Sequence, residues 1–389
     1  MLSSILFESA TLVGVPKVSE EMLAKYGYNS EHRIAMESAV ELNDIFYESF
    51  YKMEELDFQH AYATMEGADE SVLEGIVSSM SERAKGAIEK IKTFLRDLWK
   101  KVQAFFHNVK RFLDGIFMNA QDFVKKYESE LLKLTFKDKP YTVDVYDYDL
   151  DDCKSMALTT NKCCTELIGG GADAIKSAKA LAVELTGQLP AFDGSVDGKV
   201  KSPTDKSTDS AKNAARKRVD DNCEKMLKGV AGVITGEYGK YLKTSKGEDP
   251  TAAEVAEAEW RRIRKGASGE SDKKSVTITS LTPYVKFLKT SKTALSNFDK
   301  TAKTIDDMYK GVLARISDAE KIINDSKGDD ITKELILKVS SGYSKVVSKM
   351  QGWSNAIVSE NRKALQEKIA VYKKICTSAF AHADKDSKK

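Results

Sequence analysis

The histidines are the first residues to consider for chemistry, because imidazole is a common metal ligand and general base. Long stretches of sequence separate the four of them, and no two have the spacing of a metal-binding pair. They are His32, His60, His107 and His382. Since no other catalytic constellation is visible, we expect a protein that is not an enzyme and binds neither a metal nor a cofactor.

Two runs begin like ligand-binding loops but do not complete the pattern. The acidic run DYDLDD at 147–152 resembles the start of a calcium loop. However, Asp152 stands where the turn glycine is needed and Leu158 where the bidentate glutamate is needed. The run LIGGGADA at 167–174 has three consecutive glycines, but no Lys-Ser/Thr pair closes a phosphate-binding loop. We interpret the first run as a solvated loop and the second as a helix break or hinge.

The cysteines are odd in number and irregular in spacing, and none has the C-x-x-C spacing of a metal or redox site. Two adjacent cysteines cannot easily bridge each other. We expect reduced thiols in a cytosolic setting, serving as small apolar side chains. The cysteines are Cys153, Cys163, Cys164, Cys223 and Cys376.

The strongest pattern belongs to a helix around residues 88–116. Apolar residues recur there in alternating steps of three and four over four heptads, which is the a/d pattern of a coiled-coil seam. Trp99, Phe106 and Leu113 occupy the following e positions and widen the stripe. The predicted helix-packing interface consists of Ile88, Ile91, Leu95, Leu98, Trp99, Val102, Phe105, Phe106, Val109, Phe112 and Ile116.

The remaining surface of this helix is basic, since residues 81–118 contain nine Lys or Arg and four acids. A basic helix with Trp and Phe on one face is also typical of a membrane-surface helix. The unbroken 3.5-residue period favours packing against another helix, because a membrane imposes no such period. Insertion of residues 88–117 into a membrane is the alternative. Non-specific binding to phosphates is a third hypothesis for the basic body.

Short strands are expected at two places. Tyr141, Val143 and Val145 alternate with polar residues after a proline, and Val276 and Ile278 alternate in a second segment. The two segments could pair as a small sheet or hairpin. Elsewhere the patterns predict helices over 30–62, 152–185, 211–242, 251–264, 283–326 and 330–382.

The expected fold is therefore mainly α, an elongated helical bundle with long antiparallel helices and at most a small β hairpin. A final helix of roughly 50 residues would be about 75 Å long, and Asp330 is its predicted N-cap. No stretch of about 18 consecutive apolar residues predicts a transmembrane helix. The start of the chain also lacks the basic region of a secretory signal.

Charge divides the chain. Residues 1–80 contain 15 acids and four bases, a net charge of −11, whereas the rest carries 57 bases and 44 acids, or +13. An acidic arm of this kind can mask a basic body, bind a basic partner or serve as a propeptide; the alternative is that solvated helices simply differ in charge. The predicted regions are 1–80 (acidic arm), 81–186 (heptad helix and strand), 187–210 (linker or mobile loop), 211–275 (helices with a flexible end) and 276–389 (long helical hairpin).

Three segments resemble the internal or minor structural virion proteins of large tailed bacteriophages. They are the acidic opening with AMESAVELNDIFYES, the helix IEKIKTFLRDLWKKVQAFFHNVKRFLDGIF and the segment ALQEKIAVYKKICTSAFAHA. The resemblance implies a structural protein located in the virion and made in the bacterial cytoplasm. Its implied partners are other virion proteins, copies of itself and packaged DNA, with ejection alongside the DNA conceivable. It also implies prohead-protease cleavage after Glu37 or Glu41, each preceded two residues earlier by alanine.

Overall fold

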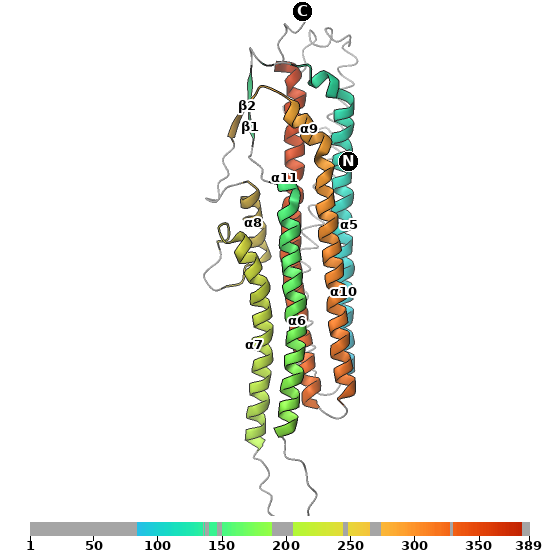
Figure 1. Ribbon diagram of the computed structural model, residues 1–389, viewed down its shortest axis with the longest axis vertical. Coiled ribbons are helices and arrows are strands. Elements are labelled where there is room, and N and C mark those ends of the chain that lie inside the picture. Colours follow the sequence, from blue (N-terminus) through green and yellow to red (C-terminus); the bar gives the residue numbers. More distant parts are fainter. Residues whose placement is uncertain are drawn as a thin grey trace, which may run out of the picture.

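The heptad pattern lies within a helix longer than the pattern itself, α5, which spans Ala84–Leu131 (Figure 1). The computed structural model describes residues 84–134, 136, 140–145, 150–188, 205–243, 248–264, 274–326 and 330–382. The acidic arm, the helix predicted over 30–62, His32, His60 and the two cleavage positions Glu37 and Glu41 lie outside these residues.

Long helices run side by side and form an elongated bundle (Figure 1). Consecutive long helices alternate in direction along one axis, so the prediction of a mainly α bundle with long antiparallel helices is confirmed. The helices after α5 are α6 (Lys154–Gln188), α7 (Asp205–Tyr238), α8 (Ala252–Ile263), α9 (Thr282–Thr290), α10 (Leu295–Asp325) and α11 (Asp330–His382).

Helix α11 is the axis of the bundle. Its 53 residues correspond to about 80 Å, and it contacts each of the other described α-helices, α5 to α10. Because neighbours approach it from several sides, it buries polar as well as apolar residues, among them Ser340, Gln351 and Asn361. The buried Trp353 donates its indole N–H to the carbonyl of Pro250, 2.7 Å away, just before α8.

The two predicted strands form one antiparallel pair. Strand β1 (Tyr141–Val145) pairs with β2 (Lys274–Ile278), and Val143 lies opposite Val276. The Tyr141 hydroxyl donates to the carbonyl oxygen of Ile375 at 2.8 Å, which attaches this small sheet to α11. Helices α6, α7 and α8 lie between the two strands in the sequence, so the pair is a small sheet of distant segments and not a local hairpin.

The interpretation of the glycine run as a helix break or hinge is wrong. Helix α6 continues through Gly169, Gly170 and Gly171 without interruption. Two of these glycines allow close packing instead: a Cβ at Gly171 would lie 2.3 Å from the ring of Tyr343, and one at Gly170 would lie 2.9 Å from Met226. Tertiary contact with α11 and α7 therefore outweighs the weak helix propensity of glycine.

The single helix predicted over 283–326 is also wrong. A short 3-10 helix, η2 (Ser291–Ala294), separates α9 from α10. Hydroxyl groups in this region bond to main-chain carbonyls of the preceding turn: Thr290 to Lys286 at 2.9 Å and Ser291 to Leu288 at 3.0 Å. Such side-chain bonds compete with regular helix geometry, which explains the tighter turn.

The predicted linker at 187–210 is too long at both ends, because α6 extends to Gln188 and α7 begins at Asp205. Of the acidic run at 147–152, the structure describes Leu150, Asp151 and Asp152. Both aspartates are exposed in the short helix η1 (Asp151–Cys153), where they have positive φ angles of 37° and 56°. Asp330, the predicted N-cap, is the first residue of α11.

Candidate functional site: the packing face of α5

The apolar face predicted on α5 lies inside the bundle. Helix α5 packs against α10, α11 and α9, and every residue of the predicted interface is buried except Trp99, which is half-buried. The buried stripe continues beyond the heptads through Phe117, Ala120 and Val124. The whole apolar face is therefore occupied by packing within the chain.

Two e positions of α5, Lys92 and Trp99, face α10. Trp99 donates its indole N–H to Asp306 Oδ1 at 2.9 Å, and its ring stacks on that of Tyr309 with centroids 6.5 Å apart. Gln103 Nε2 donates to the same oxygen at 3.0 Å. Hydrogen bonding from Lys310 most of all, with Gln103 and Trp99 contributing, holds the pKa of Asp306 below its usual value despite partial burial. Asp306 is therefore one polar anchor of the α5–α10 contact.

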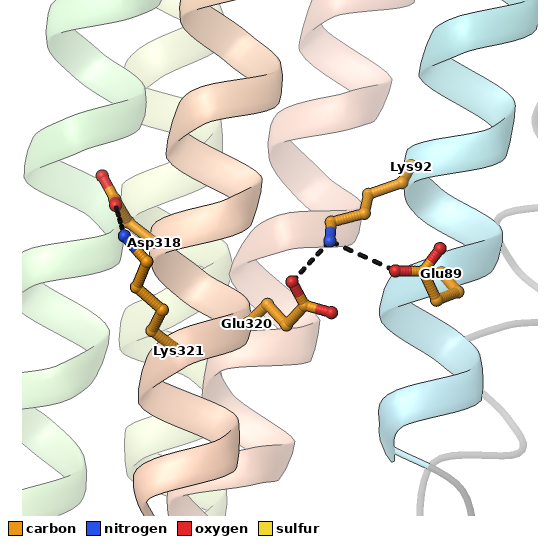
Figure 2. Close-up of polar contacts among 5 residues, drawn as sticks. All are labelled: Glu89, Lys92, Asp318, Glu320 and Lys321. Carbon is orange, nitrogen blue, oxygen red and sulfur yellow. Dashed lines mark hydrogen bonds and ion pairs between the residues drawn. The ribbon is translucent and has the colours of Figure 1, made fainter.

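Lys92 occupies the first e position and is buried between α5 and α10 (Figure 2). Its Nζ lies 2.5 Å from Glu320 Oε2 on α10 and 3.2 Å from Glu89 Oε1 on α5. Burial alone would lower the pKa of Lys92, but the hydrogen bonds to Glu320 and Glu89 outweigh burial and raise it. Figure 2 also shows Asp318 and Lys321, an exposed pair on α10 at 3.4 Å.

The predicted interface omitted Lys92, because an apolar pattern is read from apolar residues alone and lysine is charged. The signal was nevertheless present. Lys92 shares its heptad position with Trp99, Phe106 and Leu113, so a lysine there must enter the interface and needs a partner carboxylate.

A second polar cluster is buried where α8 meets α11. Glu259 has no exposed surface, and Arg262 holds it with two hydrogen bonds, from Nε at 2.6 Å and from Nη2 at 2.9 Å. Asn361 of α11 donates its Nδ2 to the same carboxylate. Two parallel N–H···O bonds from a guanidinium are the strongest form of such a pair. The cluster thus ties α8 to the axial helix.

Glu259 stabilises the charged form of Arg262. Burial opposes the charge of Arg262, but the hydrogen bonds and charge of Glu259 raise the pKa of Arg262 above its usual value. Tyr238 of α7 lies nearby, and burial, reinforced by the negative charge of Glu259, raises the pKa of its phenol well above the ordinary range. In the sequence, Glu259 follows the apolar Val255 by four residues, which places both side chains on the same face of a helix. That spacing was the available signal that Glu259 is buried.

The cysteines are free thiols. Burial raises the pKa of both Cys163 and Cys164 to about 12. Burial likewise raises the pKa of Cys376 to about 12 and of Cys223 to about 11. Since the thiolate is the nucleophile, these side chains are inert at neutral pH and pack as small apolar groups.

Within the described part of the chain, no group of three or more His, Cys, Asp or Glu residues could hold a metal ion. His107 and His382 are both exposed. A shallow open groove between α6 and α7 has Ser177, Glu184, Arg218 and Asn222 in its lining. None of the helices in the described residues is both long and apolar enough to cross a membrane.

Comparison with known proteins adds no relative to these observations. No protein-family model matches the chain, and neither a curated protein nor a solved structure matches it.

Proposed function

We propose that this chain is a non-enzymatic structural protein of a bacteriophage virion, either head-internal or a minor component. The resemblance of three sequence segments to such proteins supports the virion assignment. The proposed partners are other virion proteins or further copies of the chain, with packaged DNA contacted non-specifically.

The observation that carries a structural role is the packing around α11. This one helix, about 80 Å long, contacts all the other described α-helices. Load applied at one point of such a bundle is shared along its length, because interiors are close-packed and only slightly compressible. An elongated element of this kind suits assembly into a larger particle.

The alternative is a membrane-active protein that inserts residues 88–117. That face is buried against α10 and α11, and Lys92 and Trp99 bind carboxylates of α10 on the same side. Insertion would require α5 to leave the bundle and expose its apolar core. The structure therefore favours the structural role over the membrane role.

Mass spectrometry of gradient-purified virions of the encoding phage tests the proposal. We expect the chain in the particle, at a constant ratio to the major capsid protein across the virion peak. Detection in infected-cell lysate but not in virions would contradict the assignment.

Vesicle leakage separates the two functions. The folded chain should leave anionic vesicles intact, and Trp99→Glu should not change this result. Leakage by the wild-type chain that Trp99→Glu abolishes would instead support membrane activity.

A further inference from the structure

The solvent-facing half of α5 is strongly basic. The exposed cations from residue 85 to residue 110 define a surface that we call the basic face of α5. At about 100° per residue, they fall within half of the helix circumference, opposite the buried heptad seam. The basic face consists of Lys85, Lys90, Arg96, Lys100, Lys101 and Lys110.

Few carboxylates neutralise this face. Glu89 and Asp97 are the exposed acids of the same stretch. Glu89 is engaged by the buried Lys92, and Asp97 lies 3.5 Å from Lys100. Lys110 pairs with Asp299 of α10 at 2.8 Å. Lys90, Arg96 and Lys101 form no ion pair with any residue that the structure describes.

The chain itself contains a segment of matching charge. Residues 1–80 carry a net charge of −11, and only three residues of sequence separate them from the start of α5 at Ala84. Covalent attachment at that point gives the segment a high effective concentration at the basic face. The basic face spans about 40 Å along the helix, and a chain of this length can reach all of it.

We propose that the acidic segment 1–80 binds the basic face of α5 within the same chain and neutralises it. The attraction is electrostatic, so it requires contact within about 8 Å at physiological salt. While the segment is bound, the basic face is closed to external polyanions such as DNA. This inference depends only on charge and exposure within the chain, and so goes beyond the virion assignment.

Zero-length carbodiimide cross-linking of the full chain tests the proposal, because it joins only a carboxylate and an amine in direct contact. In low salt, monomers should show links from carboxylates of residues 1–80 to Lys90, Lys100 and Lys101. Most of these links should be lost at about 1 M salt, where the screening length falls to about 3 Å. Lys217 and Lys225, exposed on α7 at the other side of the bundle, serve as controls (Figure 1).

Equal linking to Lys217 and Lys225 would overturn the proposal. Links found only in cross-linked dimers would also overturn it, because the acidic segment bound to the basic face would then belong to a second copy of the chain.

A binding measurement gives an independent test. Changing five acids of the segment to amides in the full chain should make the basic face accessible to polyanions. The substitutions are Glu37→Gln, Glu41→Gln, Glu48→Gln, Glu54→Gln and Glu55→Gln. This variant should elute from heparin at higher salt than the wild-type chain, and adding Lys90→Glu, Lys100→Glu and Lys101→Glu should reverse the shift. Circular dichroism confirms that each variant is folded. If removing the arm carboxylates shifts elution equally with and without the three α5 substitutions, the segment does not act through this face.

Discussion

A Cβ atom at Gly171 of α6 would lie 2.3 Å from the ring of Tyr343 on α11. Real Cβ atoms essentially never come that close to another heavy atom, so the ring occupies the space that any side chain at position 171 would need. Gly342, next to Tyr343, is similar: a Cβ added there would lie 2.4 Å from Sγ of Cys223 on α7. These contacts let α6 and α7 pack closely on the axial helix.

The first prediction concerns Gly171→Ala, which should destabilise the bundle. Overpacking typically costs about 1–3 kcal/mol, and the better helix propensity of alanine offsets up to about 1 kcal/mol of this. Urea denaturation followed by circular dichroism measures the net loss. Gly169→Ala is the matched control: a Cβ there meets nothing within 4 Å, so that variant should be slightly more stable than the wild type. Equal behaviour of the two variants would refute the packing role.

The second prediction compares the Lys92–Glu320 pair with the Asp318–Lys321 pair, both drawn in Figure 2. Glu320→Ala leaves the buried Lys92 with Glu89 alone, and removing a partner from a buried charged group costs about 1–3 kcal/mol. Asp318→Ala removes an exposed pair with Lys321, and the loss should stay below about 1 kcal/mol. Chemical denaturation of both variants gives the comparison. A larger loss for Asp318→Ala would contradict the assignment of Lys92 as the interhelical contact.

The third prediction concerns the cluster that joins α8 to α11. Glu259→Leu leaves the largely buried guanidinium of Arg262 and the amide of Asn361 without their carboxylate, which should cost about 3 kcal/mol, the lower end of the range for breaking a buried pair. The double variant Glu259→Leu/Arg262→Met should recover most of that loss, because no uncompensated charge remains. A double-mutant cycle in urea measures the coupling free energy. Additive losses would show that the two side chains are not coupled.

The fourth prediction is a pH dependence at Asp306. Its pKa is lowered in the folded chain, chiefly by the hydrogen bond from Lys310. A depressed carboxyl pKa stabilises the fold above the unfolded value of about 3.9, and this contribution disappears as the pH falls through the lower folded value. Asp306→Asn should therefore destabilise the bundle at pH 7, and the difference from the wild type should narrow by pH 3.

Asp307→Asn controls for the loss of a carboxylate on the same turn, since Asp307 is exposed and lies 3.8 Å from Lys310. Its loss of stability at pH 7 should be smaller than that of Asp306→Asn, because exposed ion pairs contribute little. If the difference for Asp306→Asn is instead constant between pH 7 and pH 3, Asp306 does not contribute through its ionised form.

Regular periodicity explains which parts of the fold could be predicted. The seam from Ile88 to Ile116 repeats without interruption and predicts both the helix and its buried face. Val143 and Val276 alternate with polar neighbours and predict strands, and both lie in the sheet. The glycines at 169–171 were misread because local propensity was the only information there, and their partner Tyr343 lies far along the chain.

Buried polar residues explain why the rest could not be predicted. Lys92, Glu259 and Arg262 read as surface residues, since charged side chains are rarely buried unless paired. Lys92 pairs with Glu320 of another helix, and Glu259, besides its neighbour Arg262, accepts from Asn361 of α11. Nothing in a linear pattern states that Glu320 will stand opposite Lys92, 228 residues away.

The sequence alone determined the helical class of this protein, the buried face of α5 and the division into an acidic segment and a basic body, because periodicity and charge are properties of neighbouring residues. Only the tertiary structure decided that α11 is the axis, that Gly171 admits the ring of Tyr343, that Lys92 pairs with Glu320, and that Glu259 accepts a hydrogen bond from Asn361 inside the bundle. These features depend on contacts between distant segments, whose free energies arise only when the helices pack together.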